Sequence, residues 1–161
     1  MNELIKIFRL REQDIPEVLS IADVCGLSPW SAEAYRDEIG RADSIGLCAR
    51  FSNSLAGFII GRLVPASSAL QGPDAEIFNI GVKPEYMRRG YGNQLIDHFI
   101  KDCVNYSVYS IWLEVRAAND SAIQFYERHQ FVDSYRRKAF YSSPPDDAIV
   151  MKLQLLDLTT T

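Results

Sequence analysis

The spacing of apolar residues along the chain changes between a strand-like and a helix-like pattern. Short apolar runs rich in Ile, Val, Phe and Tyr indicate strands, and stretches with apolar residues at every third or fourth position indicate helices. The predicted strands cover residues 4–10, 44–51, 55–64, 75–82, 110–117, 131–141 and 148–155. Helices are predicted at 14–25, at 31–40, after 92 and after 119, the third with an apolar face formed by Leu95, Ile96, Phe99, Ile100 and Cys103.

Polar residues and glycines mark the expected helix ends. Asp14 followed by Glu17 resembles an N-cap pair, and Gly26 is placed to end that helix. Ser31 is the expected cap of the second helix, and Asn119 opens the last one. These signals support the helix boundaries that the apolar pattern predicts.

Strands interleaved with helices favour a single α/β (α+β) domain in which one mixed sheet carries helices on both faces. A chain of 161 residues suits one domain with one sizeable core. We expect this domain to cover residues 1–156, followed by a C-terminal tail at 157–161.

Composition and charge narrow the class of protein. Hydrophobic residues are 47% and charged residues 24% of the chain, as in ordinary soluble globular proteins. No apolar run approaches the roughly 20 residues of a membrane span, and the N-terminal segment has no signal-peptide core. The cytoplasm is therefore the expected compartment, with no membrane partner. A net charge of −4 argues against direct nucleic-acid binding, and scattered cysteines without a Cys/His cluster predict no metal.

The segment "MRRGYGNQLIDHF" places two arginines and two glycines at the start of a predicted helix. The first N–H groups of a helix have no intrahelical partner, and glycine lets an anion approach the backbone closely. Arg88, Arg89 and the nearby Lys83 add positive charge. The segment lacks the Gly-Lys-Ser/Thr ending of a P-loop and is not a GxGxxG motif. Taken alone, it fits either a phosphate-binding turn or an ordinary strand-to-helix connection with solvated arginines.

The surrounding sequence decides between these interpretations. A strand "AEIFNIGV", the Arg-Arg-Gly-Tyr-Gly turn, an amphipathic helix and then "LEVRAANDSAIQFYERHQF" resemble the GNAT superfamily of acetyl-CoA-dependent N-acetyltransferases. Within that superfamily the chain is most similar to the RimI-type ribosomal-protein-alanine N-acetyltransferases. The resemblance runs from Ser28 to Leu153 and is strongest from Phe78 to Phe131. It implies the GNAT fold, with a mostly antiparallel central sheet of about seven strands.

The resemblance also implies where acetyl-CoA binds. Backbone groups on the fourth strand meet the pantetheine arm, the turn surrounds the pyrophosphate, and one asparagine contacts the cofactor arm. The implied residues are Ile80, Gly81 and Val82; Arg88, Arg89, Gly90, Tyr91, Gly92 and Asn93; and Asn119. Met87 departs from the Gln or Arg usual in the family, which shifts phosphate binding toward the arginines and the backbone. Gln130 replaces a frequent glycine, and we expect it to adopt a strained left-handed conformation.

Acetyl transfer to an amine needs a base for the amine and a proton or hydrogen-bond donor for the departing thiolate. By the resemblance, Glu114 is the base and Tyr126 the acid. Glu114 is a charged residue within an otherwise apolar strand, as a cleft-facing group would be, but it also fits an edge carboxylate that faces water. Tyr126 also fits a core aromatic on an amphipathic helix. Glu76 is a rival base, because a related branch of the superfamily has its catalytic glutamate in an "AEI" context; it could instead position water or the acceptor amine.

The residues expected to bind the acceptor amine carry the least specific signals in the sequence. Trp30 in "SPWS" and Tyr141, expected in a late hairpin loop, resemble substrate-side elements of the family, although both also fit packing roles. His98 and His129 have no partner at ligand or triad spacing, so we interpret both as structural. The leading hypothesis is acetylation of a protein N-terminus with a small first residue such as Ala, with a ribosomal protein as a candidate acceptor. The alternatives are acetylation of a small-molecule amine or a lysine, and a non-catalytic acyl-CoA-binding module.

Overall fold

The computed structural model of the chain describes residues 4–66 and 71–156. The predicted tail at 157–161 lies outside the described residues. The strands are β1 (Lys6–Arg9), β2 (Ser44–Phe51), β3 (Ser54–Val64), β4 (Asp74–Val82), β5 (Ser110–Arg116), β6 (Val132–Ser142) and β7 (Pro145–Gln154). The helices are α1 (Ile15–Val24), α2 (Ala32–Ile39), α3 (Tyr91–Asn105) and α4 (Asp120–Arg128). The strands and helices predicted from the apolar pattern are therefore confirmed.

All seven strands form one sheet in the order β1-β2-β3-β4-β5-β7-β6. Every neighbouring pair is antiparallel except β4 and β5, which run parallel. The parallel pair follows from the connection through α3, since two parallel strands need a long crossover. The expected mixed, mostly antiparallel sheet is confirmed.

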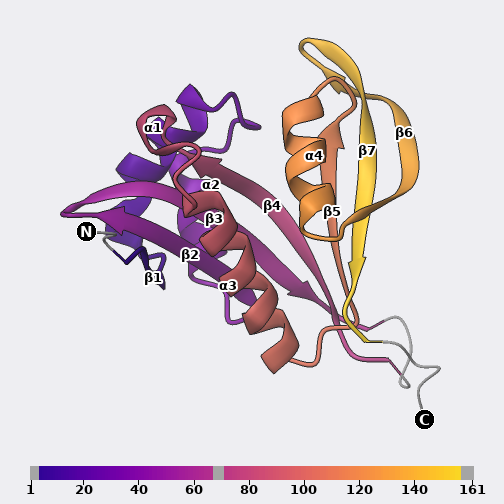
Figure 1. The fold of residues 1–161 in the computed structure, drawn as a ribbon, viewed down its shortest axis with the longest axis horizontal. Helices are drawn as coiled ribbons and strands as arrows, with labels where there is room; N and C mark the ends of the chain where they lie inside the picture. The colour runs from indigo at the N-terminus through magenta and orange to yellow at the C-terminus, as the bar shows by residue number, and fades with distance from the viewer. Residues whose placement is uncertain (1–3, 67–70, 157–161) are drawn as a thin grey trace.

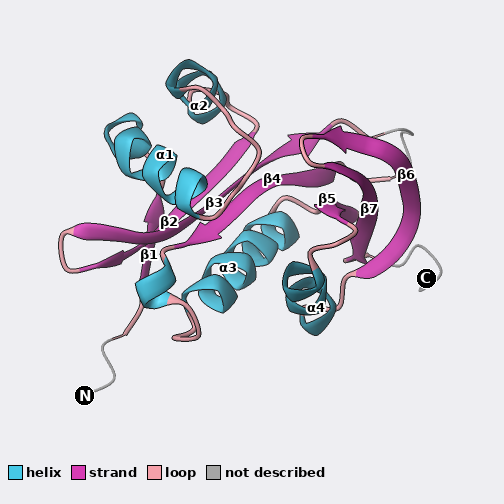
Figure 2. Ribbon diagram, turned by 90° about the horizontal axis from the view of Figure 1, so that it is seen from above, coloured by secondary structure: helices cyan, strands magenta, loops and turns pink. Residues whose placement is uncertain are grey.

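Helices cover both faces of the sheet, and each face has its own hydrophobic core (Figure 2). Helices α1 and α2 pack on one face, where Val18, Ile21 and Tyr35 are fully or almost fully buried. On the other face, α3 and α4 contribute Leu95, Phe99 and Tyr126 to the second core. The sheet therefore lies between two helical layers, with a separate core against each face.

A β-bulge in β4 changes which side chains face which core. Ile60 pairs with Asn79 and Gly61 with Ile77, so Phe78 has no partner on β3. In a regular strand, Ile77 and Asn79 would face the same side. Here Ile77 packs in the α3 core, whereas the Asn79 side chain donates a hydrogen bond to the Tyr35 hydroxyl of α2, 3.1 Å away. The bulge therefore turns the strand at the point where its pairing with β5 ends.

The helix starts agree only in part with the sequence signals. The Ser31 hydroxyl accepts a hydrogen bond from the Ala34 N–H at 3.0 Å, as expected for the cap of α2. The expected cap pair of Asp14 and Glu17 is wrong. A 3-10 turn at Glu12–Asp14 already holds the Asp14 backbone in a helical conformation, so its side chain does not cap α1. Instead, Asp14 is buried and pairs with Arg50, and Glu17 accepts a hydrogen bond from the Leu55 N–H at 2.8 Å.

The C-terminus of α4 ends in a left-handed residue, as the sequence predicts. Gln130 has φ +71°. The N–H of Phe131 donates to the Tyr126 carbonyl at 3.1 Å, and the N–H of Gln130 donates to the Glu127 carbonyl at 3.0 Å. This is the Schellman pattern, in which glycine is the preferred residue at the left-handed position.

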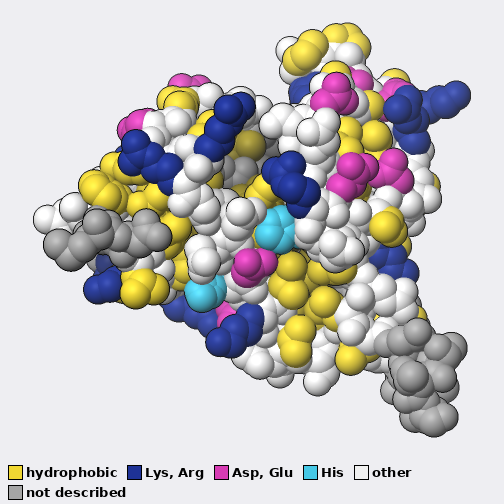
Figure 3. Space-filling view, in the orientation of Figure 1, with side chains coloured by type: hydrophobic (Ala, Val, Ile, Leu, Met, Phe, Trp, Pro, Cys, Tyr) yellow, Lys and Arg dark blue, Asp and Glu magenta, His cyan; other side chains and the backbone are white. Residues whose placement is uncertain are grey.

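The exposed surface carries charges of both signs. Figure 3 shows Lys and Arg side chains scattered among Asp and Glu side chains over the face in view. Within residues 4–66 and 71–156, none of the helices combines the length and the apolar composition that crossing a membrane requires.

Replacing Gln130 with glycine should stabilise the protein. The left-handed conformation costs a non-glycine residue roughly 1–2 kcal/mol, a cost that the substitution removes. Glycine loses more conformational entropy on folding than other residues, which reduces this gain by about 0.5–1 kcal/mol. We expect the melting temperature to rise by about 2–4 °C in calorimetry. The matched control is Gln124→Gly, within α4 itself, which should lower stability by about 1 kcal/mol. A Gln130→Gly variant that melts no higher than the wild type would contradict the strain.

Candidate active site

Strands β4 and β5 pair over only three residue pairs and then separate. Ala75, Glu76 and Ile77 are opposite Ile111, Trp112 and Leu113, and no pairing continues beyond them. Figure 1 shows the two strands together at one end and apart at the other. A cleft of about 960 Å³ opens there, lined by β4, the start of α3, the end of β5 and helix α4. This size is at the upper end of the range for small-molecule sites.

The cleft brings together most of the residues predicted to bind the cofactor. They come from the end of β4, from the turn before α3 and from the start of α4: Ile80, Gly81, Val82, Arg88, Gly90, Gly92, Asn93 and Asn119. Gly90 is the N-terminal cap of α3 with φ +89°, and Arg88 has φ +61°. Two residues with a left-handed backbone conformation thus bend this short turn. The turn lies at the N-terminus of α3, which is the positive end of the helix dipole.

Two predicted cofactor residues do not line the cleft. The Arg89 guanidinium lies 5.9 Å from the ring centre of Tyr86, against which it stacks. The Tyr91 side chain is 7% exposed and packs in the core beneath α3. Of the two arginines in this turn, Arg88 is therefore the one that lines the cleft. The Tyr91 ring is directed into the core, so Tyr91 can meet a cofactor only through its backbone.

The two asparagines predicted to bind the cofactor already have partners within the protein. The Asn119 side chain accepts a hydrogen bond from the Ala122 N–H at 3.2 Å and caps α4. The Asn93 side chain lies 2.9 Å from His129 Nε2, and His129 Nδ1 lies 3.3 Å from Asp97. The sequence shows no partner for His129 at ligand or triad spacing, but in the folded chain α3 supplies two partners. His129 joins α3 to α4, and burial lowers its pKa.

Glu114 lies near the end of β5 and lines the cleft. Its neighbours Leu113 and Val115 are buried on the opposite face, as strand alternation predicts. The Glu114 side chain is 26% exposed and forms an ion pair with Arg137 of β6, with Nε and Oε1 3.2 Å apart. Glu114 is thus a partly exposed carboxylate on the α1/α2 side of the sheet, with one cationic partner.

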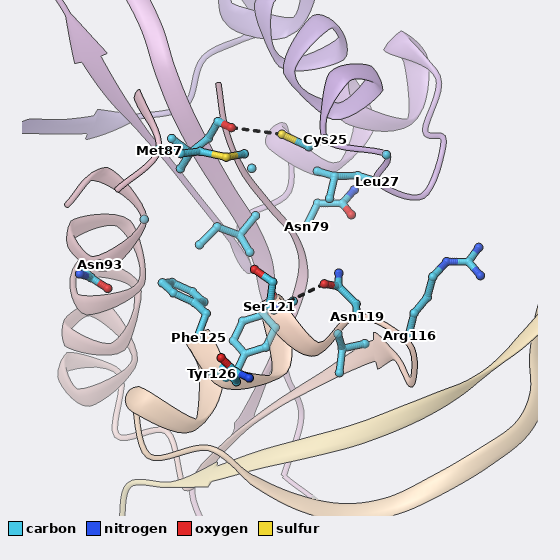
Figure 4. A pocket seen from close by; sticks show the side chains of 18 of the residues that line it. Cys25, Leu27, Asn79, Met87, Asn93, Arg116, Asn119, Ser121, Phe125 and Tyr126 are labelled. Carbon is cyan, nitrogen blue, oxygen red and sulfur yellow. Dashed lines mark hydrogen bonds between the residues drawn. The ribbon is translucent and has the colours of Figure 1, made fainter. Parts of the chain in front are cut away.

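Tyr126 reaches the same cleft from the other side of the sheet. It is 8% exposed, packs in the core under α3 and α4, and lines the cleft. Burial raises the pKa of its hydroxyl, and Tyr141 adds to this shift. The hydroxyl therefore stays protonated at neutral pH and is available as a hydrogen-bond donor. Figure 4 shows Tyr126 and Phe125 together on α4, across the cleft from Cys25.

Glu76 is close to Glu114 but is not among the residues that line the cleft. It is paired with Trp112, which is two positions before Glu114, so the two glutamates share a face of the sheet. Burial raises the pKa of the Glu76 carboxyl, and the charge of Glu114 adds to this shift. The prediction that both carboxylates lie on adjacent strands is confirmed, but of the two only Glu114 lines the cleft.

The two aromatic residues predicted on the acceptor side have different surroundings. Trp30 packs with tilted rings against Tyr35 and Phe78, whose ring centres lie 5.1 and 5.5 Å from its own, and it does not line the cleft. Tyr141 does line it. The expectation that Tyr141 lies in a hairpin loop is wrong, because the residue lies within β6 and is paired with Asp146. The Arg116 guanidinium is 4.1 Å from its ring centre.

Several residues at the cleft were not predicted from the sequence. Cys25 lines it between α1 and α2, and its thiol donates to the Val82 carbonyl at 3.2 Å. Arg116 at the end of β5 lines the cleft with its guanidinium against the Tyr141 ring of β6, and Arg137 of β6 forms an ion pair with Glu114. A local motif could not reveal these contacts, because each joins segments far apart in sequence. In the described part of the chain, no three His, Cys, Asp or Glu side chains gather as a metal site would need.

Comparison with known families agrees with this geometry. The sequence model of the acetyltransferase (GNAT) family matches residues 15–131. The chain belongs to the GNAT family. As a GNAT enzyme it is an acetyl-CoA-dependent N-acetyltransferase, and both the predicted family and the predicted activity are confirmed.

Individual relatives match this chain over nearly its whole length. The [ribosomal protein bS18]-alanine N-acetyltransferase of Salmonella typhimurium is 31% identical over 148 residues, covering 91% of this chain and 95% of that protein. The crystal structure of the ribosomal-protein-S18-alanine N-acetyltransferase from Escherichia coli superposes with a TM-score of 0.81 at 27% identity, covering 98% and 99% of the two chains. Arabidopsis thaliana Naa50 in complex with the bisubstrate analogue CoA-Ac-MVNAL, at 21% identity and a TM-score of 0.81, shares the fold.

Gly90→Val should weaken acetyl-CoA binding. Valine disfavours the left-handed conformation of position 90, and its branched side chain hinders an anion from approaching the turn. We expect the affinity measured by calorimetry to fall by about tenfold or more, since a loss near 1.4 kcal/mol corresponds to a factor of ten. Asparagine tolerates this conformation, so Gly90→Asn should lose less. Wild-type affinity in Gly90→Val would count against phosphate binding at this turn.

Proposed function

We propose that this enzyme transfers the acetyl group of acetyl-CoA to the N-terminal α-amino group of a protein that begins with a small residue such as Ala. One observation carries the proposal: Glu114 and Tyr126 meet at a single cleft from opposite faces of the sheet. The 31% identical relative named for alanine acetylation of ribosomal protein bS18 supports this acceptor class. A ribosomal protein is therefore the first acceptor to test, and the cytoplasm stays the predicted compartment.

The cleft suits acetyl-CoA along its whole length. Beyond Ile77, the edge of β4 that faces β5 is no longer paired with it, so backbone groups on this edge are available to an extended chain with amide groups, such as pantetheine. The Val82 carbonyl at the end of β4 already accepts from the Cys25 thiol. The turn from Arg88 to Asn93 would then meet the pyrophosphate at the N-terminus of α3. We also propose that residues 1–156 form one catalytic domain, because the single sheet extends from Lys6 to Gln154.

The proposed reaction is a direct transfer. The acceptor nitrogen attacks the thioester carbonyl carbon, the C–N bond forms, the C–S bond breaks and the electron pair leaves with sulfur. Glu114, through a bridging water, takes the proton that the amine loses. Tyr126 donates a hydrogen bond to the departing sulfur. A free thiol has a pKa near 8.5, and burial raises the pKa of Tyr126 above its usual value near 10, so hydrogen bonding is favoured over full proton transfer.

The chemistry of the acceptor favours an α-amine over lysine. An α-amino group has a pKa of about 7.7–8.0 and lysine about 10.4, so neutralising them at pH 7 costs about 1 and about 5 kcal/mol respectively. A partly exposed carboxylate paired with Arg137 suits the easier deprotonation. Acetylation of a small-molecule amine remains the second candidate, because it shares the acetyl-CoA half of the cleft. A non-catalytic acyl-CoA-binding module would not need both Glu114 and Tyr126 at the cleft.

Tyr126→Phe should slow turnover much more than it weakens acetyl-CoA binding. The substitution removes the donor to sulfur and keeps the buried ring. We expect the turnover number to fall by about 100-fold, in the range of a general acid–base contribution. Kinetics measures the turnover number and calorimetry measures the affinity for acetyl-CoA, so the two effects can be separated. The control is Tyr106→Phe, because Tyr106 is exposed in the α3–β5 connection. An unchanged turnover number would remove Tyr126 from the mechanism.

Glu114→Gln should slow the reaction more than Glu76→Gln. Glu114 lines the cleft and Glu76 does not, so we expect losses of about 100-fold and less than about tenfold in turnover number. Both changes keep the size of the side chain, and acetyl-CoA affinity checks that the cleft is intact. The reverse order would identify Glu76 as the base.

The acceptor class is tested with one peptide in two forms. One form has a free N-terminal alanine; the other has a blocked N-terminus and an available lysine. We expect the free form to be acetylated faster, by about 100-fold or more from the difference in deprotonation cost. Mass spectrometry locates the acetyl group. Faster acetylation of the blocked peptide would favour a lysine or small-amine acetyltransferase.

A further inference from the structure

The β6–β7 hairpin contains an irregular segment beside Glu114. Pairing is regular at Arg137 with Ala148 and resumes at Tyr141 with Asp146. Residues 138–140 of β6 are thus opposite Asp147 alone, and Ala139 has φ +53°. The Asp147 carboxylate stabilises this bulge, accepting from the Ala139 N–H at 2.8 Å and from Arg136 at 3.0 Å.

The bulge brings a second aromatic ring next to Arg137. Tyr135 and Arg137 are two apart and share a face, but Phe140 is three residues from Arg137 and would face the other side of a regular strand. With the bulge, the Arg137 guanidinium lies 5.7 Å from the Tyr135 ring centre and 5.6 Å from that of Phe140. It also donates to the Tyr135 hydroxyl at 3.3 Å. Two rings and a hydroxyl therefore limit the positions that this guanidinium can take.

The sheet register directs this guanidinium toward Glu114. Arg137 pairs with Ala148 of β7, and Ala148 pairs with Arg116 of β5, two positions after Glu114. Paired residues share a face, so Arg137 and Glu114 are on the same side, with the small side chain of Ala148 between their strands. The resulting ion pair is 3.2 Å long. Glu76 also interacts electrostatically with Glu114, so Arg137 supplies a positive charge where two carboxylates approach each other.

We propose that Arg137 is a positioning residue that holds the Glu114 carboxylate in its working orientation at the cleft. This rests on the proposed role of Glu114 as the base. The side chains of Arg137 and Glu114 are 47% and 26% exposed, so their ion pair contributes little to folding stability. Its effect is on orientation, since a base must stay within hydrogen-bond reach of the proton or water it serves.

Arg137→Gln should lower the turnover number at saturating substrates by about tenfold, a typical cost of disturbing a positioned catalytic group. Acetyl-CoA affinity and melting temperature should stay close to wild type. Arg137→Lys keeps the charge but loses the planar fork, so it should recover part of the rate. The matched control is Arg136→Gln, the neighbouring arginine, which binds Asp147 instead of Glu114. An equal loss in Arg136→Gln would overturn the proposal, because the hairpin as a whole would then be responsible.

A double substitution shows whether Arg137 acts through Glu114. If it does, Arg137→Gln should cause no further loss in turnover number in a Glu114→Gln background. A further tenfold loss there would overturn the inference and leave the proposed base intact. Full activity of Glu114→Gln alone would overturn the proposed base and this inference together. If Glu114→Gln lowers the turnover number and Arg137→Gln leaves it unchanged, the positioning role alone would be overturned.

Discussion

The site depends on one constraint in the sheet: β4 and β5 are paired over only three residue pairs. If β4 and β5 remained paired along their whole length, their side chains would fill the space of the cleft. Their facing backbone groups would then be used in pairing with each other. Their separation creates the cleft and leaves the end of β4 free for an extended ligand. It also lets Tyr126 from the α3/α4 face and Glu114 from the α1/α2 face reach the same space.

Two bulges place side chains that a regular strand would direct elsewhere. In β4, the unpaired Phe78 turns Asn79 toward Tyr35 and away from the face that holds Ile77. In β6, the segment opposite Asp147 returns Phe140 to the side of Arg137. A bulge shifts the alternation of side chains without changing the order of strands. The fold can therefore stay the same while the chemistry at the cleft is adjusted by single residues.

The sequence predicts the parts of this protein that local physics determines. Apolar periodicity identifies the strands and helices of the described residues, and the Ser31 cap follows from residue chemistry. The left-handed conformation of Gln130 is expected from the family resemblance, because glycine is frequent at that position in the family. Resemblance to the GNAT family supplies the cleft residues on β4 and α3. The missed contacts are long-range: Asp14 pairs with Arg50 instead of capping, and His129 reaches Asn93 and Asp97. No local pattern encodes such partners, because they depend on how the layers pack.

Packing also explains why the proposed cofactor recognition relies on the backbone. The side chains of Asn93 and Asn119 are engaged with His129 and the start of α4, Arg89 stacks on Tyr86, and Tyr91 is in the core. These four side chains thus make contacts within the protein, while Arg88 lines the cleft. Under the proposed function, Arg88 and the N–H groups at the start of α3 are left to contact the phosphates. A methionine at position 87 is compatible with this arrangement, because binding through backbone groups depends on the conformation of the turn more than on the side chain that precedes it.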